Sequence, residues 1–314
     1  MRVVVLGAGV SGLSCAVRLL EAGHEVDVWT RDAPSDTTSA VAAAVWYPYR
    51  AGPQEKIAAW ALSSLEAFRG LSEAGAGGVF LSEVLELFRE PTPDPWYREL
   101  LPGFRRARPA DLPPHCRDGW TASSVPVIEM PPYLAWLVAR IEEAGGRVVR
   151  REARSIEEAA TAADVVVNCA GMGARELCDD RALVPVRGQV VVVSQVGLER
   201  VVLDEHGPGG LTYIVPRRSD VVLGGTADEG DESLEPMDAT ARDIFERCAA
   251  LEPRLRAARI LGHKVGLRPG RPAVRLEAER AGDAIVVHNY GHGGSGVTLS
   301  WGCADDVVGL VSSA

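Results

Sequence analysis

The stretch Arg2-Val-Val-Val-Leu-Gly-Ala-Gly-Val-Ser-Gly12 sets the architecture of this chain. Residues 2–6 form a short apolar run of the kind that makes a buried parallel strand. Three glycines with the spacing G-x-G-x-x-G come next. The first permits a tight turn after the strand, the second lets the backbone approach a pyrophosphate, and the third lets the following helix pack close to the sheet.

The residues after this loop complete the expected setting. Residues 10–22 have the apolar period of a helix, which stops at Gly23, and Glu25–Thr30 predicts a second strand. The N-terminus of such a helix offers unpaired backbone N–H groups and a partial positive charge to phosphates. We therefore expect a dinucleotide to contact the loop, whose residues are Gly7, Ala8, Gly9, Val10, Ser11 and Gly12.

An acidic residue about 20 positions after such a loop normally holds the adenosine ribose. Asp32, preceded by Arg31, is the candidate here, although the predicted strand already ends at Thr30. From its position alone, Asp32 could equally be a plain turn residue.

Hydrophobic periodicity predicts the remaining elements. Helices are expected at residues 53–71, 132–143, 238–251 and 296–311, and strands at 147–150, 164–169, 189–194, 211–216, 220–224 and 284–288. Residues 90–132 are rich in proline and are expected to be irregular. Buried-strand patterns alternate with turn-rich strand patterns along the chain. This indicates an α/β fold of two interleaved domains, one doubly wound and one built on a mixed, largely antiparallel sheet.

The composition is that of an ordinary globular protein of 314 residues, with 46% hydrophobic and 24% charged residues. The net charge of −10 argues against a nucleic-acid partner, because phosphate binding needs a basic surface. No stretch reaches the roughly 18 apolar residues of a membrane helix. We therefore expect no membrane segment and a cytoplasmic location.

Two further glycine-rich segments stand where a ligand could meet the backbone. Residues 165–173 have a buried-strand pattern that ends in small residues, among them Gly171, and ligands of nucleotide-binding folds lie at the carboxyl ends of strands. Residues 288–297 lead into the final helix through Gly291, Gly293, Gly294 and Gly296. Such a run places backbone against something flat or charged, although a flexible turn could have the same sequence.

The segment Gly266-Leu-Arg-Pro-Gly-Arg-Pro272 supplies a candidate anion clamp. A guanidinium in a rigid turn is suited to bidentate binding of a carboxylate, which favours Arg268. Arg271 lies in the same segment, and the pattern alone does not rank the two. We predict no metal site, because glycines interrupt any helix that could align His288 with His292.

Together these motifs resemble the D-amino acid oxidase family of FAD flavoproteins, over nearly the whole chain. The most specific pieces are Ala43-Ala-Val-Trp-Tyr-Pro-Tyr49, Arg187-Gly-Gln189, Thr212-Tyr-Ile-Val-Pro216, Gly224-Gly-Thr226, Gly266-Leu-Arg-Pro269, Val274-Arg-Leu-Glu277 and His288-Asn-Tyr-Gly-His-Gly-Gly294. The resemblance implies FAD as the cofactor. We accordingly expect a Rossmann-like FAD-binding domain of residues 1–45, 131–182 and 281–314, interleaved with a substrate domain of residues 46–130 and 183–280.

The resemblance also assigns roles to single residues. Arg268 matches the arginine that binds the substrate carboxylate, Tyr213 the tyrosine whose hydroxyl assists it, and Gly294 the glycine whose carbonyl accepts a hydrogen bond from the substrate amino group. Arg31 and Asp32 resemble the arrangement near the adenosine in fungal members. The other FAD contacts that we expect beyond the glycine loop are Thr37, Thr38, Ala43, Ala44, Val45, Gly171, Arg268, Gly291, Gly293, Gly294, Gly296, Val297 and Thr298.

The implied reaction is oxidative deamination of a D-amino acid by dioxygen to a 2-oxo acid, ammonia and hydrogen peroxide. Residues 204–210 are short and glycine-rich where mammalian members carry a longer lid with a second tyrosine. D-Aspartate oxidase relatives carry an arginine just after the Gly-Gly-Thr segment, where this chain has Ala227. Neutral or apolar D-amino acids are therefore the expected substrates, although Arg50 could replace the missing partner of an acidic one. The sequence does not predict the oligomeric state, and a homo-oligomer is one possibility.

Three alternatives remain. A glycine or sarcosine oxidase-like enzyme would share the fold and the G-L-R-P segment. The first glycine loop alone would also suit a nicotinamide dehydrogenase or a non-catalytic nucleotide-binding protein.

Overall fold

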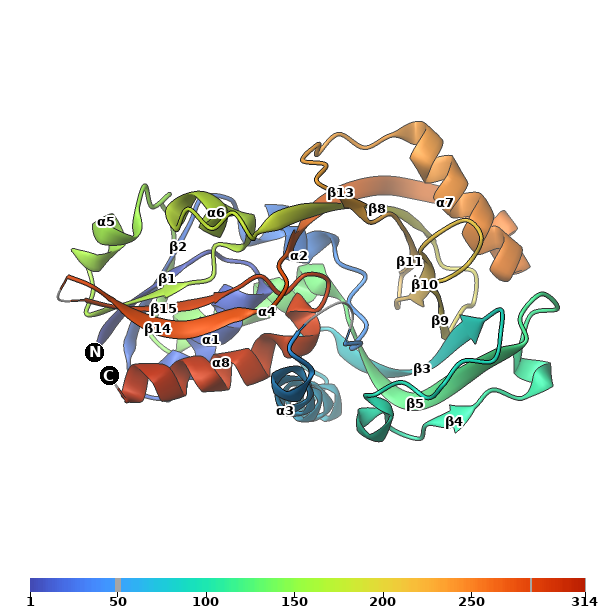
Figure 1. The fold of residues 1–314 in the computed structure, drawn as a ribbon, viewed down its shortest axis with the longest axis horizontal. Coiled ribbons are helices and arrows are strands. Elements are labelled where there is room, and N and C mark those ends of the chain that lie inside the picture. Colours follow the sequence, from blue (N-terminus) through green and yellow to red (C-terminus); the bar gives the residue numbers. More distant parts are fainter. Residues whose placement is uncertain (49–51, 283, 314) are drawn as a thin grey trace.

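A computed structural model describes residues 1–48, 52–282 and 284–313. Two β-sheets lie side by side, and the strands β8 and β13 run from one toward the other (Figure 1). The first sheet has the order β14-β15-β7-β1-β2-β6, in which all neighbours are parallel except β14 and β15. Its strands are β1 (Arg2–Leu6), β2 (Glu25–Thr30), β6 (Arg147–Arg150), β7 (Val165–Asn168), β14 (Arg275–Ala281) and β15 (Ala284–Tyr290).

Helices cover both faces of this sheet. Val3 and Val5 of β1 pack in the core that contains α1 (Val10–Glu21) and α8 (Gly296–Ser312). Val4 and Leu6 face the opposite way, onto α5 (Ile156–Ala160). Because side chains alternate across a strand, a sheet covered on both faces needs apolar residues at every position. This explains the continuous apolar run of β1 and confirms the doubly wound arrangement that the sequence predicts.

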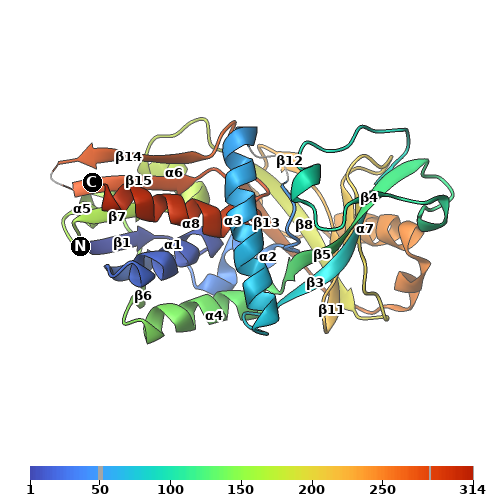
Figure 2. The ribbon, with the colours of Figure 1, turned by 90° about the horizontal axis from the view of Figure 1, so that it is seen from below.

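Two further helices complete this half of the molecule. The helix α4 (Met130–Glu143) packs on α1, and α3 (Gln54–Glu73) crosses α8 (Figure 2). At this crossing, a Cβ added to Gly302 would lie 2.4 Å from the Cα of Trp60. The glycine therefore lets the two helix backbones approach closely.

The second sheet has nine strands and is almost entirely antiparallel. Its order is β12-β8-β11-β10-β9-β3-β5-β4, with β13 on the other side of β8, and only β3 and β9 are parallel. The strands are β3 (Val79–Phe88), β4 (Arg105–Arg106), β5 (Asp118–Ile128), β8 (Val184–Ser194), β9 (Val201–Asp204), β10 (Thr212–Pro216), β11 (Asp220–Gly224), β12 (Asp228–Glu229) and β13 (Ile260–Gly270). The helix α7 (Asp238–Leu251) covers one face of this sheet through Ile244 and Cys248.

The remaining helices are short. They are α2 (Thr38–Val41), α6 (Ala174–Leu177) and the single 3₁₀ turns at Pro34–Asp36, Arg98–Leu100, Pro109–Asp111, Gly171–Gly173 and Pro253–Ala257. None of the helices in the described ranges combines the length and the apolar character needed to cross a lipid bilayer.

The expectation that residues 90–132 are irregular is wrong, because β4 and the whole of β5 lie within them. The pairing of β5 with β3 shifts register between Ser82 and Val84, and Ser124 has a positive φ of 58°. The exposed residues Ser123 and Ser124 interrupt the buried positions on either side. A bulge of this kind breaks the alternation on which strand prediction depends.

Outside residues 90–132, the sequence patterns also miss five of the described strands, which are β3, β9, β12, β13 and β14. The strand β13 contains Arg268, which pairs with Val186 of β8, so the expectation that Arg268 stands in a rigid turn is wrong. The sequence of β13 contains glycines and a proline, which are rare in strands, so its pattern does not predict one. The strand forms because it pairs with β8 along its length. The strand β14 is a charged edge strand, and the expected domain boundary between residues 280 and 281 falls inside it.

Candidate active site

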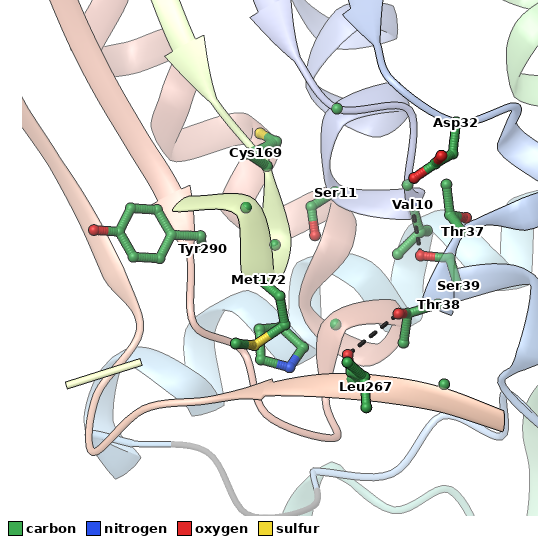
Figure 3. A pocket seen from close by; sticks show the side chains of 18 of the residues that line it. Val10, Ser11, Asp32, Thr37, Thr38, Ser39, Cys169, Met172, Leu267 and Tyr290 are labelled. Atoms are coloured by element: carbon green, nitrogen blue, oxygen red, sulfur yellow. Dashed lines mark hydrogen bonds between the residues drawn. The ribbon is translucent and has the colours of Figure 1, made fainter. Parts of the chain in front are cut away.

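A cavity of about 670 Å³ opens at the carboxyl ends of the parallel strands. Leu6, Thr30 and Tyr290, the last residues of β1, β2 and β15, all line it. The first residues of α1 and α8 line it too, as do parts of α2, β8 and β13. Figure 3 shows its wall from the glycine loop at Val10 and Ser11 to Tyr290. Ligands of open α/β sheets bind at this edge, so the cavity lies where the sequence places a nucleotide.

The first and third glycines of the loop lie against backbone rather than open space. Gly7 has a φ of +101°, and a Cβ added to it would lie 2.6 Å from the carbonyl oxygen of Cys169. A Cβ added to Gly12 would lie 2.0 Å from the carbonyl oxygen of Gly7. The N–H of Val10 donates to Ser39 Oγ at 3.0 Å, which holds the start of α1 against the α2 segment (Figure 3). The loop therefore tolerates no side chain at its first and third glycine positions.

Two helix N-termini face this one cavity. The N-cap of α1 is Gly9, which has no side chain, and neither α1 nor α8 carries an acidic residue in its first turn. Their N–H groups and positive dipole ends therefore favour a negatively charged ligand. A dinucleotide carries such charge on its pyrophosphate, and a reduced flavin carries it on its ring. The cavity volume is also in the range of ligand and cofactor pockets. The described residues thus fit FAD.

The end of the cavity near β2 carries the adenosine candidates. Arg31 Nη2 and Asp32 Oδ2 lie 2.9 Å apart, and both residues line the cavity. Thr30 Oγ1 donates to the carbonyl oxygen of Asp32 at 2.7 Å, which closes a tight turn. The guanidinium of Arg151 lies 3.7 Å from the centre of the Trp29 ring. Asp32 is therefore both part of a turn and available to a ligand, and the contact with the ribose stays a prediction.

Arg268, Tyr213 and Gly294 line the same cavity, although they come from β13, β10 and the loop before α8. The guanidinium of Arg268 lies flat against Gly188, where an added Cβ would be 2.3 Å from Nη1, and it donates to the carbonyl oxygen of Thr226 at 2.9 Å. One nitrogen is thus anchored while the side chain borders the cavity.

Tyr213 stands beside this arginine. It pairs with Gly224 of β11, and a Cβ on that glycine would overlap the tyrosine ring. Burial raises the pKa of the Tyr213 hydroxyl, and the charge of Arg268 partly offsets this. The hydroxyl therefore stays protonated and can donate a hydrogen bond to an anion.

Most of the expected site residues line this cavity. Those that do are Gly7, Ala8, Gly9, Val10, Ser11, Arg31, Asp32, Thr37, Thr38, Gly171, Tyr213, Arg268, Gly293, Gly294, Gly296 and Val297. Those that do not are Gly12, Ala43, Ala44, Val45, Gly291 and Thr298. Arg50 lies outside the described residues.

Several residues outside the lining support those inside it. Thr298 Oγ1 donates to the carbonyl oxygen of Tyr47 at 2.9 Å and accepts from its N–H at 3.0 Å. Val45 forms an isolated bridge with Val127. A Cβ added to Gly291 would lie 2.9 Å from the Arg271 side chain. These contacts hold the segment of Val45 and Tyr47 against β5 and α8, and they place Gly291 against Arg271.

Sequence reasoning missed other lining residues, among them Gly188, Ser39, Arg151 and His292. Gly188 lies within the quoted Arg187-Gly-Gln189 motif, but no local pattern shows that it must face an arginine from another strand. His292 lies 3.0 Å from Asn289 Oδ1 through Nε2, and burial lowers its pKa to about 4. It is therefore neutral at physiological pH.

Comparisons with known proteins agree with this geometry. The model of the FAD dependent oxidoreductase family matches residues 2–310. A D-amino-acid oxidase of Rubrobacter xylanophilus is 57% identical over 315 residues, which cover 100% of this chain and 96% of that protein. A human D-aspartate oxidase is 39% identical over 326 residues, which cover 99% and 94%. The crystal structure of glycine oxidase from Geobacillus kaustophilus superposes with a TM-score of 0.86 at 19% identity, covering 99% of this chain and 95% of that one. At that identity the likeness concerns the fold alone.

Proposed function

The chain belongs to the D-amino-acid oxidase family of FAD-dependent oxidoreductases, and from this premise we propose which residues hold FAD and substrate and which D-amino acids are oxidised. It is a flavoprotein oxidase that deaminates D-amino acids oxidatively. One observation carries the assignment of residues: Arg268 and Tyr213 border the same cavity as the glycine loop, from which they are far removed in sequence.

We assign the pyrophosphate of FAD to the N-terminus of α1 and the adenosine to the Arg31–Asp32 turn. The residues at the N-terminus of α8, from Gly293 to Val297, would border the flavin ring. FAD, when bound, supplies the acceptor for the hydrogen and electron pair of the substrate Cα–H bond and returns the electrons to dioxygen as hydrogen peroxide. Thr37 and Thr38 would contribute from the α2 side. We also propose that the FAD-binding domain extends to the whole of β14, which places its boundary before Arg275.

The protein groups around the substrate bind and orient it. We propose that Arg268 forms an ion pair with the carboxylate and that the Tyr213 hydroxyl donates to the same group. The carbonyl of Gly294 would accept a hydrogen bond from the amino group. Two fixed points on the α-carbon leave a single face of it directed toward the cofactor, which gives the preference for one enantiomer. No side chain has to act as a strong base if the amine arrives neutral, so positioning supplies most of the rate.

The family alone does not say which substrate side chains are accepted, because relatives of this chain include both a D-amino-acid oxidase and a D-aspartate oxidase. We propose that neutral and apolar D-amino acids are substrates and that acidic ones are poor. Ala227 follows Thr226, whose carbonyl anchors Arg268, and it offers no positive charge to a second carboxylate. Use of dioxygen, a homo-oligomer and a cytoplasmic location also remain predictions.

A comparison of peroxide release from D-valine, D-aspartate and sarcosine tests this proposal. We expect D-valine to give the highest kcat/KM, with D-aspartate and sarcosine each at least about tenfold lower, which corresponds to roughly 1.4 kcal/mol of transition-state binding. Preferred oxidation of sarcosine would instead support a glycine or sarcosine oxidase-like enzyme. Preferred oxidation of D-aspartate would show that another residue replaces the missing arginine.

A further inference from the structure

The loop of residues 230–237, which leads into α7 (Figure 1), brings one apolar side chain to the large cavity. Leu234 lines that cavity, and 61% of its surface is exposed. The other residues of the loop do not line it. An exposed leucine on the wall of a cofactor cavity is suited to contact a ligand, because burial of its apolar surface stabilises the complex.

A single buried guanidinium holds the backbone on both sides of Leu234. Arg187 Nε donates to the carbonyl oxygen of Ser233 at 2.9 Å, and Arg187 Nη2 donates to that of Glu235 at 2.6 Å. These two residues flank Leu234 directly in the chain. Arg187 is only 1% exposed and does not line the cavity. It therefore fixes the position of the leucine and does not bind a ligand itself.

Both ends of the loop are fixed to β8 as well. The Gly230 N–H donates to the carbonyl oxygen of Pro185 at 2.8 Å. The buried Gln189 side chain accepts a hydrogen bond from the Met237 N–H at 2.9 Å and donates one to the Met237 carbonyl oxygen at 2.7 Å. A loop that is held at both ends and at its centre has little conformational entropy to lose when a ligand binds. The leucine is thus preorganised for contact.

An ion pair joins this loop to the other half of the molecule. Arg175 Nη1 lies 2.7 Å from Glu232 Oε1. Arg175 belongs to α6, which follows the Gly171–Gly173 turn of the proposed FAD-binding domain, and that turn also lines the cavity. Both side chains of the pair are exposed, so the pair adds little stability. It shows, however, that the loop reaches from the substrate domain to the FAD-binding domain.

We propose that Leu234 packs against bound FAD and that Arg187 is the positioning residue that keeps it there. The 230–237 loop would then retain the cofactor from the side of the substrate domain, whereas the N-terminus of α1 binds its pyrophosphate. The inference rests on the proposed function, because it takes from it the placement of FAD in the large cavity.

Retention of FAD by the holoenzyme tests this inference. The protein is dialysed to equilibrium at a series of FAD concentrations, and the difference in flavin absorbance across the membrane gives the Kd. We expect Leu234→Ala to weaken FAD binding by about 5- to 30-fold, because it removes most of an apolar contact with the cofactor. Leu261→Ala truncates a leucine of β13 that is 55% exposed and does not line the cavity, so it should keep the wild-type Kd.

Arg187→Lys tests the positioning role. Lysine keeps the positive charge but lacks the planar fork that holds both carbonyl oxygens. We expect this change to weaken FAD binding in the wild-type background and to have little further effect in the Leu234→Ala background. This loss of effect is expected because Arg187 acts on FAD only through Leu234, and coupled residues are not additive.

The remaining outcomes contradict the inference in different ways. A wild-type FAD Kd in a folded Leu234→Ala protein would overturn it, even if Arg187→Lys fails to fold. A raised KM for D-valine with an unchanged FAD Kd would overturn it too, since Leu234 would then contact the substrate. Equal effects of Arg187→Lys in both backgrounds would refute the positioning role. If Gly12→Ala also kept the wild-type Kd, the proposed placement of FAD would fail, which is a separate result.

Discussion

Arg268→Leu is expected to lower kcat/KM for D-amino acids by about 10²- to 10³-fold, mainly through a higher KM, while FAD remains bound. The guanidinium lies on Gly188 and donates one hydrogen bond to the carbonyl oxygen of Thr226, so its remaining donors can serve a carboxylate. Truncating one partner of a buried, hydrogen-bonded charge pair costs roughly 2–5 kcal/mol. Leucine removes that pair, whereas the pyrophosphate seat at α1 is left untouched. Steady-state kinetics on D-valine and the flavin absorbance of the purified variant measure the two effects separately.

Arg271→Leu is the matched control for this variant. Arg271 comes from the same stretch of sequence but does not line the cavity, and it donates to Asp180 at 3.0 Å and to the carbonyl oxygen of Ala273 at 2.8 Å. We expect its removal to lower the melting temperature and to leave the KM for D-valine close to the wild-type value. If Arg268→Leu kept wild-type KM, or if Arg271→Leu had the larger effect on KM, the carboxylate would bind elsewhere.

Gly12→Ala is expected to weaken FAD binding strongly. The new methyl group would lie 2.0 Å from the carbonyl oxygen of Gly7, so either α1 must move away from β1 or the loop must change shape. Overpacking against movable side chains already costs about 1–3 kcal/mol, and a fixed backbone relaxes less. A displacement of either kind removes the helix N-terminus from the phosphates. The variant should therefore purify colourless. If the displacement costs roughly 3 kcal/mol or more of binding free energy, added FAD should bind at least about 100-fold more weakly.

Gly70→Ala provides the comparison for Gly12→Ala. Gly70 lies within α3 and has no atom within 4 Å of an added Cβ. It should keep the flavin and gain slightly in stability, because alanine favours a helix more than glycine does. Far-UV circular dichroism distinguishes a folded apoprotein from an unfolded one. Tight FAD binding by a folded Gly12→Ala protein would mean that the cofactor does not depend on this loop.

The first sheet could be predicted from the sequence because its signals are local. The apolar run of β1, the glycines at 7, 9 and 12 and the period of α1 all lie within 21 residues. The more distant motifs then indicated the family by their resemblance to D-amino acid oxidases, and the comparisons confirm that family.

Much of the second sheet could not be predicted, because long-range pairing forms it. The strand β13 exists through its register with β8, about 76 residues earlier in the chain, and the bulge in β5 removes the alternation that would have revealed it. The difference between Arg268 and Arg271 was hidden for the same reason. One lies on Gly188 inside the cavity and the other is tied to Asp180 outside it, and both partners come from other segments.

Sequence patterns also could not predict that Tyr47, Glu86 and Trp120 line one cavity of about 260 Å³. Glu86 stands in an apolar strand, Tyr47 follows the first α/β unit, and Trp120 lies in a region expected to be irregular. Glu86 and Trp120 meet because β3 and β5 are neighbours in the second sheet, and Tyr47 joins them from a segment outside both strands. A single buried acid in a strand carries no local signal of what it faces.

Peroxide release by the purified, FAD-loaded protein from paired D- and L-enantiomers of alanine and valine examines the whole proposal at once. The carboxylate clamp and the single face of the α-carbon directed toward the cofactor predict rapid peroxide formation with each D-amino acid and none above background with its L-partner. Equal rates with both enantiomers, or no peroxide with either, would show that the cavity at Arg268 does not perform this reaction.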